Sequence, residues 1–155
     1  MAVALSYLRN KKFQEIVRIY WGVVMKGLFS KGWMMKFMDE WNNEPSVFNE
    51  LAQIKFNSNI AYGFKSDDEP VGVLVVSKGR AISADEYDGE ELNWDLRANP
   101  EDWKEWLQNP PSILTIGMAY SSRKLKFNKG DYSSMLKDPR MAGPFIKSFV
   151  VMGRI

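Results

Sequence analysis

The hydrophobic pattern of this chain changes period near Ile54, and this change limits the fold more than any other feature. Before Ile54, apolar residues recur every three or four positions, which is the spacing of amphipathic helices. After it they alternate with polar residues, as in strands that bury one face. The 155 residues amount to about one domain. Helices and strands must therefore share a core, and we predict an α+β fold with a five-stranded, mainly antiparallel sheet and helices packed on one face.

The first third of the chain is predicted to be helical. Residues 12–28 place apolar side chains at i, i+3, i+4 and i+7, and a second apolar face runs from Trp33 to Trp41. The aromatic and methionine side chains of that second face could form a lid, a dimer surface or ordinary core, of which ordinary core is favoured. A shorter apolar pattern follows Pro45, so the chain enters the sheet only after these helices.

Four strands joined by turns are predicted to follow. Val71–Val76 is an almost continuous β-branched run, which is typical of a central strand covered on both faces. Tight-turn signals at 78–79 and 88–89 predict that the four strands form an antiparallel meander. A fifth strand alternates apolar with polar residues later in the chain. The predicted strands are Ile54–Phe64, Val71–Val76, Arg80–Tyr87, Leu92–Arg97 and Lys124–Asn128.

A helix is predicted between the fourth and fifth strands. Asn99 is a good N-cap, and Pro100 suits the first helical position. Trp103, Trp106 and Leu107 then fall on one apolar face. The two indoles could pack in the core, contact a ligand, or do both.

The remaining segments are an apolar link and two short helices. Ile113–Tyr120 is expected to be a link that leads toward the fifth strand. Asp131 is expected to cap a helix that ends at Pro139, and Gly143-Pro144 is expected to start the last helix.

The absence of Cys and His excludes several kinds of chemistry. It rules out disulfides, thiol nucleophiles, catalytic histidines and the usual zinc ligand sets. Tyr62 and Tyr120 could still donate a proton near a pocket, but no pair of residues has the spacing of an acid–base pair. We therefore expect a non-enzymatic protein with no catalytic residues, metal or cofactor. A small enzyme acting on a bound acyl or aromatic compound is the least favoured alternative.

The distribution of charge bears on membranes and location. No window of about 18 residues is both apolar and uncharged, so no transmembrane helix is expected. The first nine residues do not have the pattern of a signal peptide, and we expect a cytoplasmic protein. The net charge of +2 is too small to predict nucleic-acid binding.

Arg123, Lys124, Lys126 and Lys129 form a basic cluster around the fifth strand. They could attract anionic lipid headgroups or the phosphates of coenzyme A, with transient contact to a membrane surface. The favoured alternative is that they protect an exposed strand from edge pairing. Aromatic residues are nearly absent among them, so nucleic acid is not an expected partner.

Several of these segments, taken in order, resemble the sterol carrier protein 2 (SCP2) family. They are the strand series, Asn-Pro-Glu-Asp-Trp-Lys-Glu-Trp-Leu at 99–107, Met118-Ala119-Tyr120, and Lys124-Leu125-Lys126-Phe127 ahead of Gly130-Asp131. The resemblance covers roughly Pro45 to the C-terminus. It implies a single SCP2-like lipid-binding domain over 1–155, with a helical N-terminal extension at 12–41 and a core at 45–155.

The SCP2 family carries sterols, fatty acids and acyl-CoAs in an apolar tunnel between sheet and helices. By this resemblance, the chain is expected to be a non-catalytic intracellular carrier of such a hydrophobic ligand. The alternative is a non-catalytic partner subunit that presents a hydrophobic substrate to an enzyme of lipid or aromatic degradation, and a homodimer or an enzyme partner is compatible with either. The implied tunnel lining comprises Trp103, Trp106, Leu107, Ile116, Met118, Ala119, Tyr120, Leu125, Phe127, Met135, Phe145, Phe149 and Met152.

Overall fold

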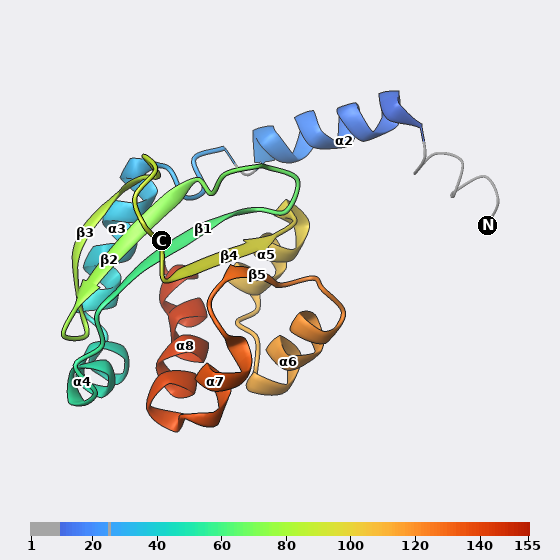
Figure 1. The fold of residues 1–155 in the computed structure, drawn as a ribbon. Helices are drawn as coiled ribbons and strands as arrows, with labels where there is room; N and C mark the ends of the chain where they lie inside the picture. Colours follow the sequence, from blue (N-terminus) through green and yellow to red (C-terminus); the bar gives the residue numbers. More distant parts are fainter. Residues whose placement is uncertain (1–9, 25) are drawn as a thin grey trace.

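The computed structural model describes residues 10–24 and 26–155, which form seven helices and five strands (Figure 1). The predicted α+β class is confirmed. The helices are α2 (Lys11–Val24), α3 (Lys31–Asn42), α4 (Pro45–Gln53), α5 (Pro100–Gln108), α6 (Ile113–Ser121), α7 (Tyr132–Lys137) and α8 (Pro139–Met152). The strands are β1 (Ser58–Phe64), β2 (Gly72–Ser77), β3 (Arg80–Glu86), β4 (Trp94–Ala98) and β5 (Lys126–Lys129).

The five strands form one sheet in the order β3-β2-β1-β4-β5, so β1 lies at its centre. The pairs β1–β2, β2–β3 and β4–β5 are antiparallel, and the sheet is mainly antiparallel as predicted. The predicted meander is wrong at the fourth strand. β4 pairs with β1, runs parallel to it, and places Leu96 opposite Tyr62.

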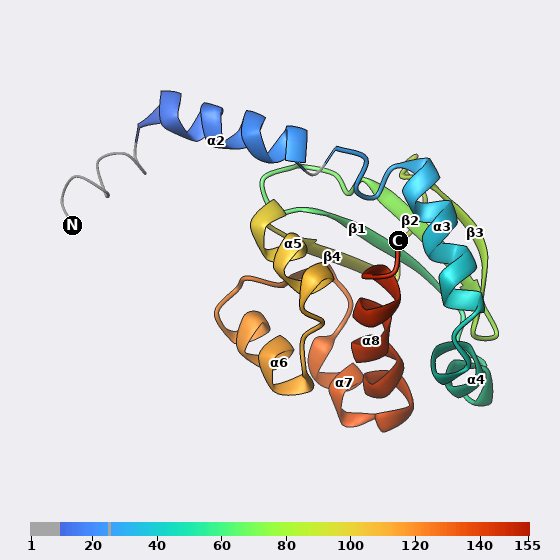
Figure 2. The same ribbon diagram turned by 180° about the vertical axis from the view of Figure 1, so that it is seen from behind.

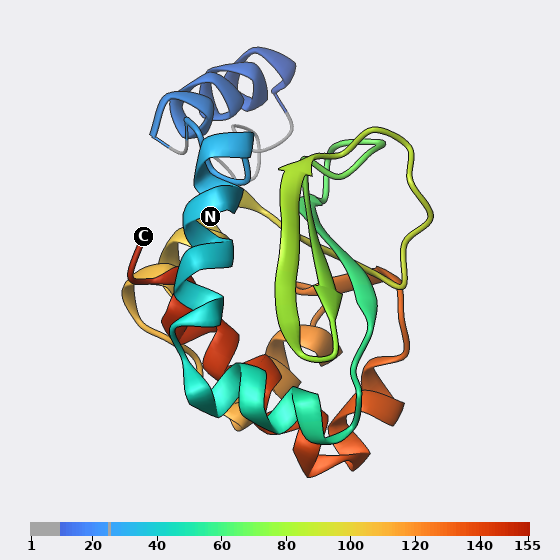
Figure 3. The same cartoon turned by 90° about the vertical axis from the view of Figure 1, so that its left-hand side faces the viewer.

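Residues 87–93 explain why β4 does not return beside β3. Gly89 bends the backbone, with a positive φ of 87°, but the chain then crosses one face of the sheet (Figure 3). The Asn59 side chain donates a hydrogen bond to the Glu91 carbonyl (2.9 Å), and the Asn93 amide donates to the Asn59 carbonyl (3.0 Å). The glycine at position 89 therefore predicts the bend correctly. The pairing of the next strand depends instead on the hydrogen bonds of Asn59 with residues 91 and 93.

The helices cover one face of the sheet, as predicted, and residues 87–93 cross the other (Figure 3). α3 packs along β3, and α8 packs against α3, α4 and α7. Met34, Phe37 and Trp41 of α3 are buried, which confirms ordinary core as the role of this face. β5 lies at one edge of the sheet and carries the exposed Lys126 and Lys129, consistent with protection of that edge.

Phe29 lies at the centre of an aromatic core between the helices and the sheet. Its side chain is fully buried, and its ring centroid lies 5.0 Å from that of Trp103, 5.2 Å from Trp33 and 5.5 Å from Tyr62. Such aromatic pairs are each worth about 0.5–1.5 kcal/mol beyond the area they bury. Phe29 has a φ of 64°, a left-handed conformation that few residues other than glycine adopt. Packing of its ring therefore holds the turn that leads into α3.

The helix expected over 12–28 is observed as α2, but it ends at Val24. Gly27 and Phe29 both have positive φ angles, so the helix cannot continue to Leu28. α2 extends away from the sheet and the other helices (Figures 1 and 2). Ile16 and Ile19 on its apolar face are 57% and 60% exposed.

Two other predicted boundaries are wrong for local reasons. The first strand begins at Ser58 instead of Ile54, because Lys55 has a φ of 51° in the turn that ends α4. The expected link at Ile113–Tyr120 is the helix α6. The Ser112 hydroxyl caps it by accepting a hydrogen bond from the Thr115 amide (3.1 Å). Its helical period is hidden in the sequence because α6 is apolar on nearly all sides and has no polar face to contrast with a buried one.

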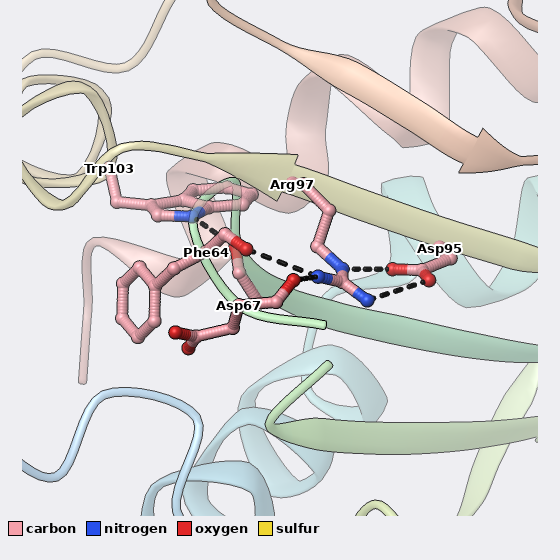
Figure 4. A network of polar contacts seen from close by, with 6 residues as sticks. Phe64, Asp67, Asp95, Arg97 and Trp103 are labelled. Atoms are coloured by element: carbon pink, nitrogen blue, oxygen red, sulfur yellow. Dashed lines mark hydrogen bonds and ion pairs between the residues drawn. The ribbon is translucent and has the colours of Figure 1, made fainter. Parts of the chain in front are cut away.

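Asp95 and Arg97 form a buried ion pair on the sheet face opposite the helices (Figure 4). The alternation along β4 puts polar residues on this face, and these two residues are only 6% and 1% exposed. Two hydrogen bonds of 2.6 and 3.1 Å join the guanidinium to the carboxylate. The guanidinium also donates to the carbonyls of Phe64 (3.1 Å) and Asp67 (2.8 Å), so the pair ties β4 to the turn after β1. This supplies the partners that buried charges require.

Candidate functional site

An apolar pocket lies between the helical face of the sheet and α8. Its cavity volume is about 50 Å³. The walls come from β1, β4 and β5 on one side and from α3, α4, α7 and α8 on the other. The lining residues are Trp41, Leu51, Phe56, Ile60, Tyr62, Trp94, Leu96, Phe127, Met135, Met141, Pro144, Phe145 and Ser148.

The floor of the pocket is set by the pairing of β1 with β4. Side chains alternate between the two faces of a strand, and the parallel register puts Ile60 opposite Trp94 and Tyr62 opposite Leu96. These four side chains therefore lie on one face of the sheet, toward the helices. Asp95 and Arg97, at the intervening positions of β4, point to the other face.

One stripe of α8 forms the opposite wall. Met141, Pro144, Phe145 and Ser148 lie at i, i+3, i+4 and i+7, so they share one face of the helix. α7 ends at Lys137, just before Pro139, as predicted. The last helix, α8, begins at Pro139 and not at Gly143-Pro144, because proline is tolerated at the first helical position. Pro144 lies inside α8.

Pro144 weakens α8 at the pocket wall. It has no amide hydrogen, so it cannot donate the i to i−4 hydrogen bond that a helix interior normally makes. The residue before it is Gly143, where a Cβ atom would meet open space and no neighbouring side chain within 4 Å. Fewer hydrogen bonds and side-chain contacts therefore hold the backbone at Gly143 and Pro144 than hold the turns of α8 on either side.

Gly130 is required by the approach of β5 to the pocket wall. Its φ is 98°, and a Cβ atom at this position would overlap the ring of Trp94. Glycine has no Cβ atom, so it can adopt this positive φ and also leave room for the Trp94 ring. Asp131 then caps α7 by accepting hydrogen bonds from the amides of Ser133 (3.0 Å) and Ser134 (3.3 Å), as predicted.

Most polar atoms of the lining are bonded within the protein. The Trp41 indole donates to the Gly79 carbonyl (3.0 Å), and the Trp94 indole donates to the Ser58 hydroxyl (3.3 Å). The Ser148 hydroxyl donates to the Phe145 carbonyl. The Tyr62 hydroxyl makes no hydrogen bond to any other described residue. Burial raises the pKa of Tyr62, so this hydroxyl keeps its proton at neutral pH.

The pocket is suited to enclosing an apolar molecule. Its lining contains no Asp, Glu, Lys or Arg among the described residues, and so offers no pair of groups for acid–base catalysis. Across 10–24 and 26–155, no cluster of acidic side chains could hold a metal ion. In the same ranges, no helix is both long enough and apolar enough to cross a membrane.

The comparisons with known proteins identify the fold. No protein-family model matches the sequence, and no curated protein matches it. The crystal structure of sterol carrier protein 2 matches with a TM-score of 0.67 and 19% identity, over 83% of this chain and 98% of that one. The chain has the SCP2 fold.

Two further solved structures share the SCP2 fold with this chain. The solution structure of TT1886 from Thermus thermophilus, described as possibly a sterol carrier protein, matches with a TM-score of 0.57 and 18% identity. This match covers 82% of this chain and 85% of that one. The ubiquinone synthesis protein UbiJ-SCP2 matches with a TM-score of 0.54 and 11% identity, over 84% and 95% of the two chains. These structures support the fold without a close sequence relationship.

The SCP2-like fold brings three of the expected tunnel residues to the pocket, namely Phe127, Met135 and Phe145. Trp103, Ile116 and Leu125 are fully buried in the surrounding core. Trp106, Ala119, Phe149 and Met152 are also buried, Leu107 is half-buried, and Met118 and Tyr120 are exposed. The assignment of all thirteen residues to ligand contact stays a prediction.

Sequence reasoning missed the larger part of the lining. Ile60, Tyr62, Trp94 and Leu96 each fall on an apolar strand face, but their meeting depends on the parallel register of β1 and β4. Met141 lay before the expected start of the last helix at Gly143-Pro144, and Pro144 was expected only as the start of that helix. The other lining residues not foreseen are Trp41, Leu51, Phe56 and Ser148.

Proposed function

We propose that this protein is a non-catalytic carrier that holds a hydrophobic ligand in the pocket between the sheet and α8. The observation that carries the proposal is the apolar lining of the pocket. Among the polar groups of this lining, only the Tyr62 hydroxyl makes no hydrogen bond to a described residue, and it is buried. The SCP2 fold supports the same role, since one solved protein of this fold is named sterol carrier protein 2.

The ligand class is an acyl chain or another lipid with a polar end. Enclosing apolar groups is worth about 0.8 kcal/mol per methylene, so a 16-carbon chain gains at most about 13 kcal/mol. Association costs of about 4–15 kcal/mol leave weak to submicromolar affinity, which suits release of the cargo. The Tyr62 hydroxyl would donate a hydrogen bond to the carboxylate or carbonyl at the polar end.

A long chain requires a larger pocket than the one observed. A water molecule needs about 10–15 Å³ of such volume, so about 50 Å³ has room for only a few. Met135, Met141 and Phe145 can adopt other rotamers, and methionine side chains are adaptable. The missing hydrogen bond at Pro144 lets the start of α8 move outward, and we expect the pocket to enlarge along this path.

The test is displacement of a fluorescent fatty acid from the purified full-length chain, with native mass spectrometry to detect co-purified lipid. Saturable binding with one site per chain is the expected result. Absence of both saturable binding and bound lipid would overturn the proposal.

A second candidate function rests on α2. Ile16 and Ile19 expose apolar surface on a helix that extends away from the sheet. Such a surface would allow the protein to act as a partner subunit that presents its ligand to an enzyme. The description of UbiJ-SCP2 as a ubiquinone synthesis protein is compatible with this role. A monomer in sedimentation that recovers no partner in a pull-down would count against it.

A further inference from the structure

α6 carries an exposed apolar surface that the pocket does not use. Ile116 and Ala119 face the core, whereas Ile113, Leu114 and Met118 are 51%, 72% and 65% exposed. Leu114 and Met118 are the two most exposed large apolar side chains in the described part of the chain. A helix that is apolar on both its inner and its outer side is typical of one that is covered on both sides.

The chain segment that contains α6 carries charge of a single sign, and an acidic partner outside it is Asp102 of α5, which interacts with Lys124 and Lys65. The sequence from Leu107 to Gly130 contains no Asp or Glu. Its charged residues are Arg123, Lys124, Lys126 and Lys129, all of them exposed. None of the four forms an ion pair within 10–24 and 26–155. The Lys65 side chain adds a further amine, since it donates a hydrogen bond to the Arg123 carbonyl (2.6 Å).

One layer of aromatic rings connects this surface to the pocket. Tyr120, in the last turn of α6, stacks on Tyr132 with ring centroids 4.1 Å apart. The same ring lies edge-on to Phe127, with centroids 5.9 Å apart, and Phe127 lines the pocket. The C-terminal end of α6 therefore lies beside the pocket wall.

We propose that α6 is a docking element for an anionic lipid surface. Ile113, Leu114 and Met118 enter the boundary between headgroups and acyl chains, and the four basic residues contact the lipid phosphates. Exposed aliphatic side chains on the same segment as a cluster of basic residues match the two attractions that hold interfacial helices on membranes. The proposal rests on the proposed carrier function. Docking through α6 would bring a source of lipid next to the pocket that holds the ligand.

The test is co-sedimentation of the full-length chain with phosphatidylcholine vesicles that do or do not contain phosphatidylglycerol. The double variant Leu114→Ser/Met118→Ser is expected to bind the anionic vesicles about tenfold or more weakly than the unchanged chain. The variant Lys126→Gln/Lys129→Gln is expected to lose about tenfold on anionic vesicles, with no change on neutral ones. The matched control Met35→Ser/Ile82→Ser removes exposed apolar side chains from α3 and β3 and should bind within about twofold of the unchanged chain.

Several outcomes would overturn the docking proposal. They are unchanged vesicle binding by the α6 variant, loss of binding by the Met35→Ser/Ile82→Ser control instead, or no vesicle binding by the unchanged chain. The last result would leave a protein partner as the occupant of α6. If the double variant does not fold, the single change Leu114→Ser, at the more exposed position, replaces it in the assay.

A second readout separates this proposal from the carrier function. Fatty-acid displacement without vesicles should be the same for the single variant Leu114→Ser and the unchanged chain, because Leu114 neither lines the pocket nor belongs to the expected tunnel lining. Vesicle binding without fatty-acid binding would sustain docking and reject the carrier role.

Discussion

The indole nitrogen of Trp103 donates a hydrogen bond of 2.9 Å to the carbonyl oxygen of Gly63. This bond joins α5 to the end of β1 inside the protein, and Trp103 is fully buried (Figure 4). Trp103 also contacts Phe29 and Phe149 through its ring. It therefore joins the central strand to the turn before α3 and to α8, and its main role in this structure is to hold the core around the pocket.

Trp103→Phe should destabilise the protein more than the comparable change at Trp106. The variant leaves the Gly63 carbonyl without its indole partner and removes buried ring volume, so the free energy of unfolding should fall by about 2–4 kcal/mol. Trp106 is buried as well, but its indole makes no hydrogen bond to any described residue. Trp106→Phe should cost about half as much. Urea denaturation measures both, and equal losses would contradict the role assigned to the Gly63 bond.

Arg97→Met should be strongly destabilising because it leaves the Asp95 carboxylate buried without its partner. Breaking a buried pair in this way costs about 3–5 kcal/mol. The control is Arg140→Met, which breaks the Asp138–Arg140 pair at a site where the arginine side chain is 59% exposed. That change should leave the unfolding free energy almost unchanged, because water and salt screen an exposed pair. Similar effects of the two variants in chemical denaturation would contradict the interpretation of Figure 4.

Stability should fall in acid partly through Glu44. A hydrogen bond from Arg154 is the main cause that lowers the pKa of the Glu44 carboxyl, with Ser46 and Lys147 adding to it. A lowered pKa in the folded state means that this contribution is present above the ordinary pKa of Glu, about 4.3, and is lost as pH falls through the folded value. Glu44→Gln should flatten the dependence of the melting temperature on pH below about 4.5. An unchanged slope would show that the contacts with Arg154 and Lys147 do not contribute.

Met135→Trp should reduce ligand binding by filling the pocket. The larger side chain occupies space that the ligand needs, and overpacking should also cost about 1–3 kcal/mol of stability. Met35→Trp is the matched control, because Met35 lies on α3 with 45% exposure and does not line the pocket. Equilibrium dialysis with a radiolabelled fatty acid avoids interference from the added indole. Full affinity in a folded Met135→Trp variant would place the ligand elsewhere.

Tyr62→Phe should weaken binding of ligands with a polar end. Loss of one hydrogen bond of about 0.5–1.5 kcal/mol corresponds to about two- to tenfold in the dissociation constant of a fatty acid. A hydrocarbon probe without a headgroup should bind both forms equally. Equal weakening for the two ligands would indicate a packing effect and contradict the role proposed for the hydroxyl.

Local signals predicted much of the fold. The cap at Asp131, the glycine turns around β2 and β3, and the apolar spacing of α2, α3 and α5 each depend on neighbours in sequence. The parallel pairing of β1 with β4 could not be predicted in this way, because it depends on contacts of Asn59 with residues more than thirty positions away. The tunnel and the division at 12–41 and 45–155 stay predictions.

The candidate site was harder to predict than the fold. Phe127, Met135 and Phe145 lie on recognisable elements, and the resemblance to SCP2 selected them. The alternation that placed Tyr62 on an apolar face gave no register to bring it opposite Leu96. Alternation puts Arg97 on the polar side of its strand, but it cannot show that the carbonyls of Phe64 and Asp67 surround the guanidinium.

The parallel pairing of β1 with β4 also bears on how the chain is made. β1 is the central strand, yet the partner on one of its sides is synthesised only after β2, β3 and residues 87–93. Until Trp94–Ala98 leaves the ribosome, that side of β1 is an open edge. Open strand edges promote association between chains. A nascent chain that pauses after β3 therefore exposes the middle of its future sheet to other chains.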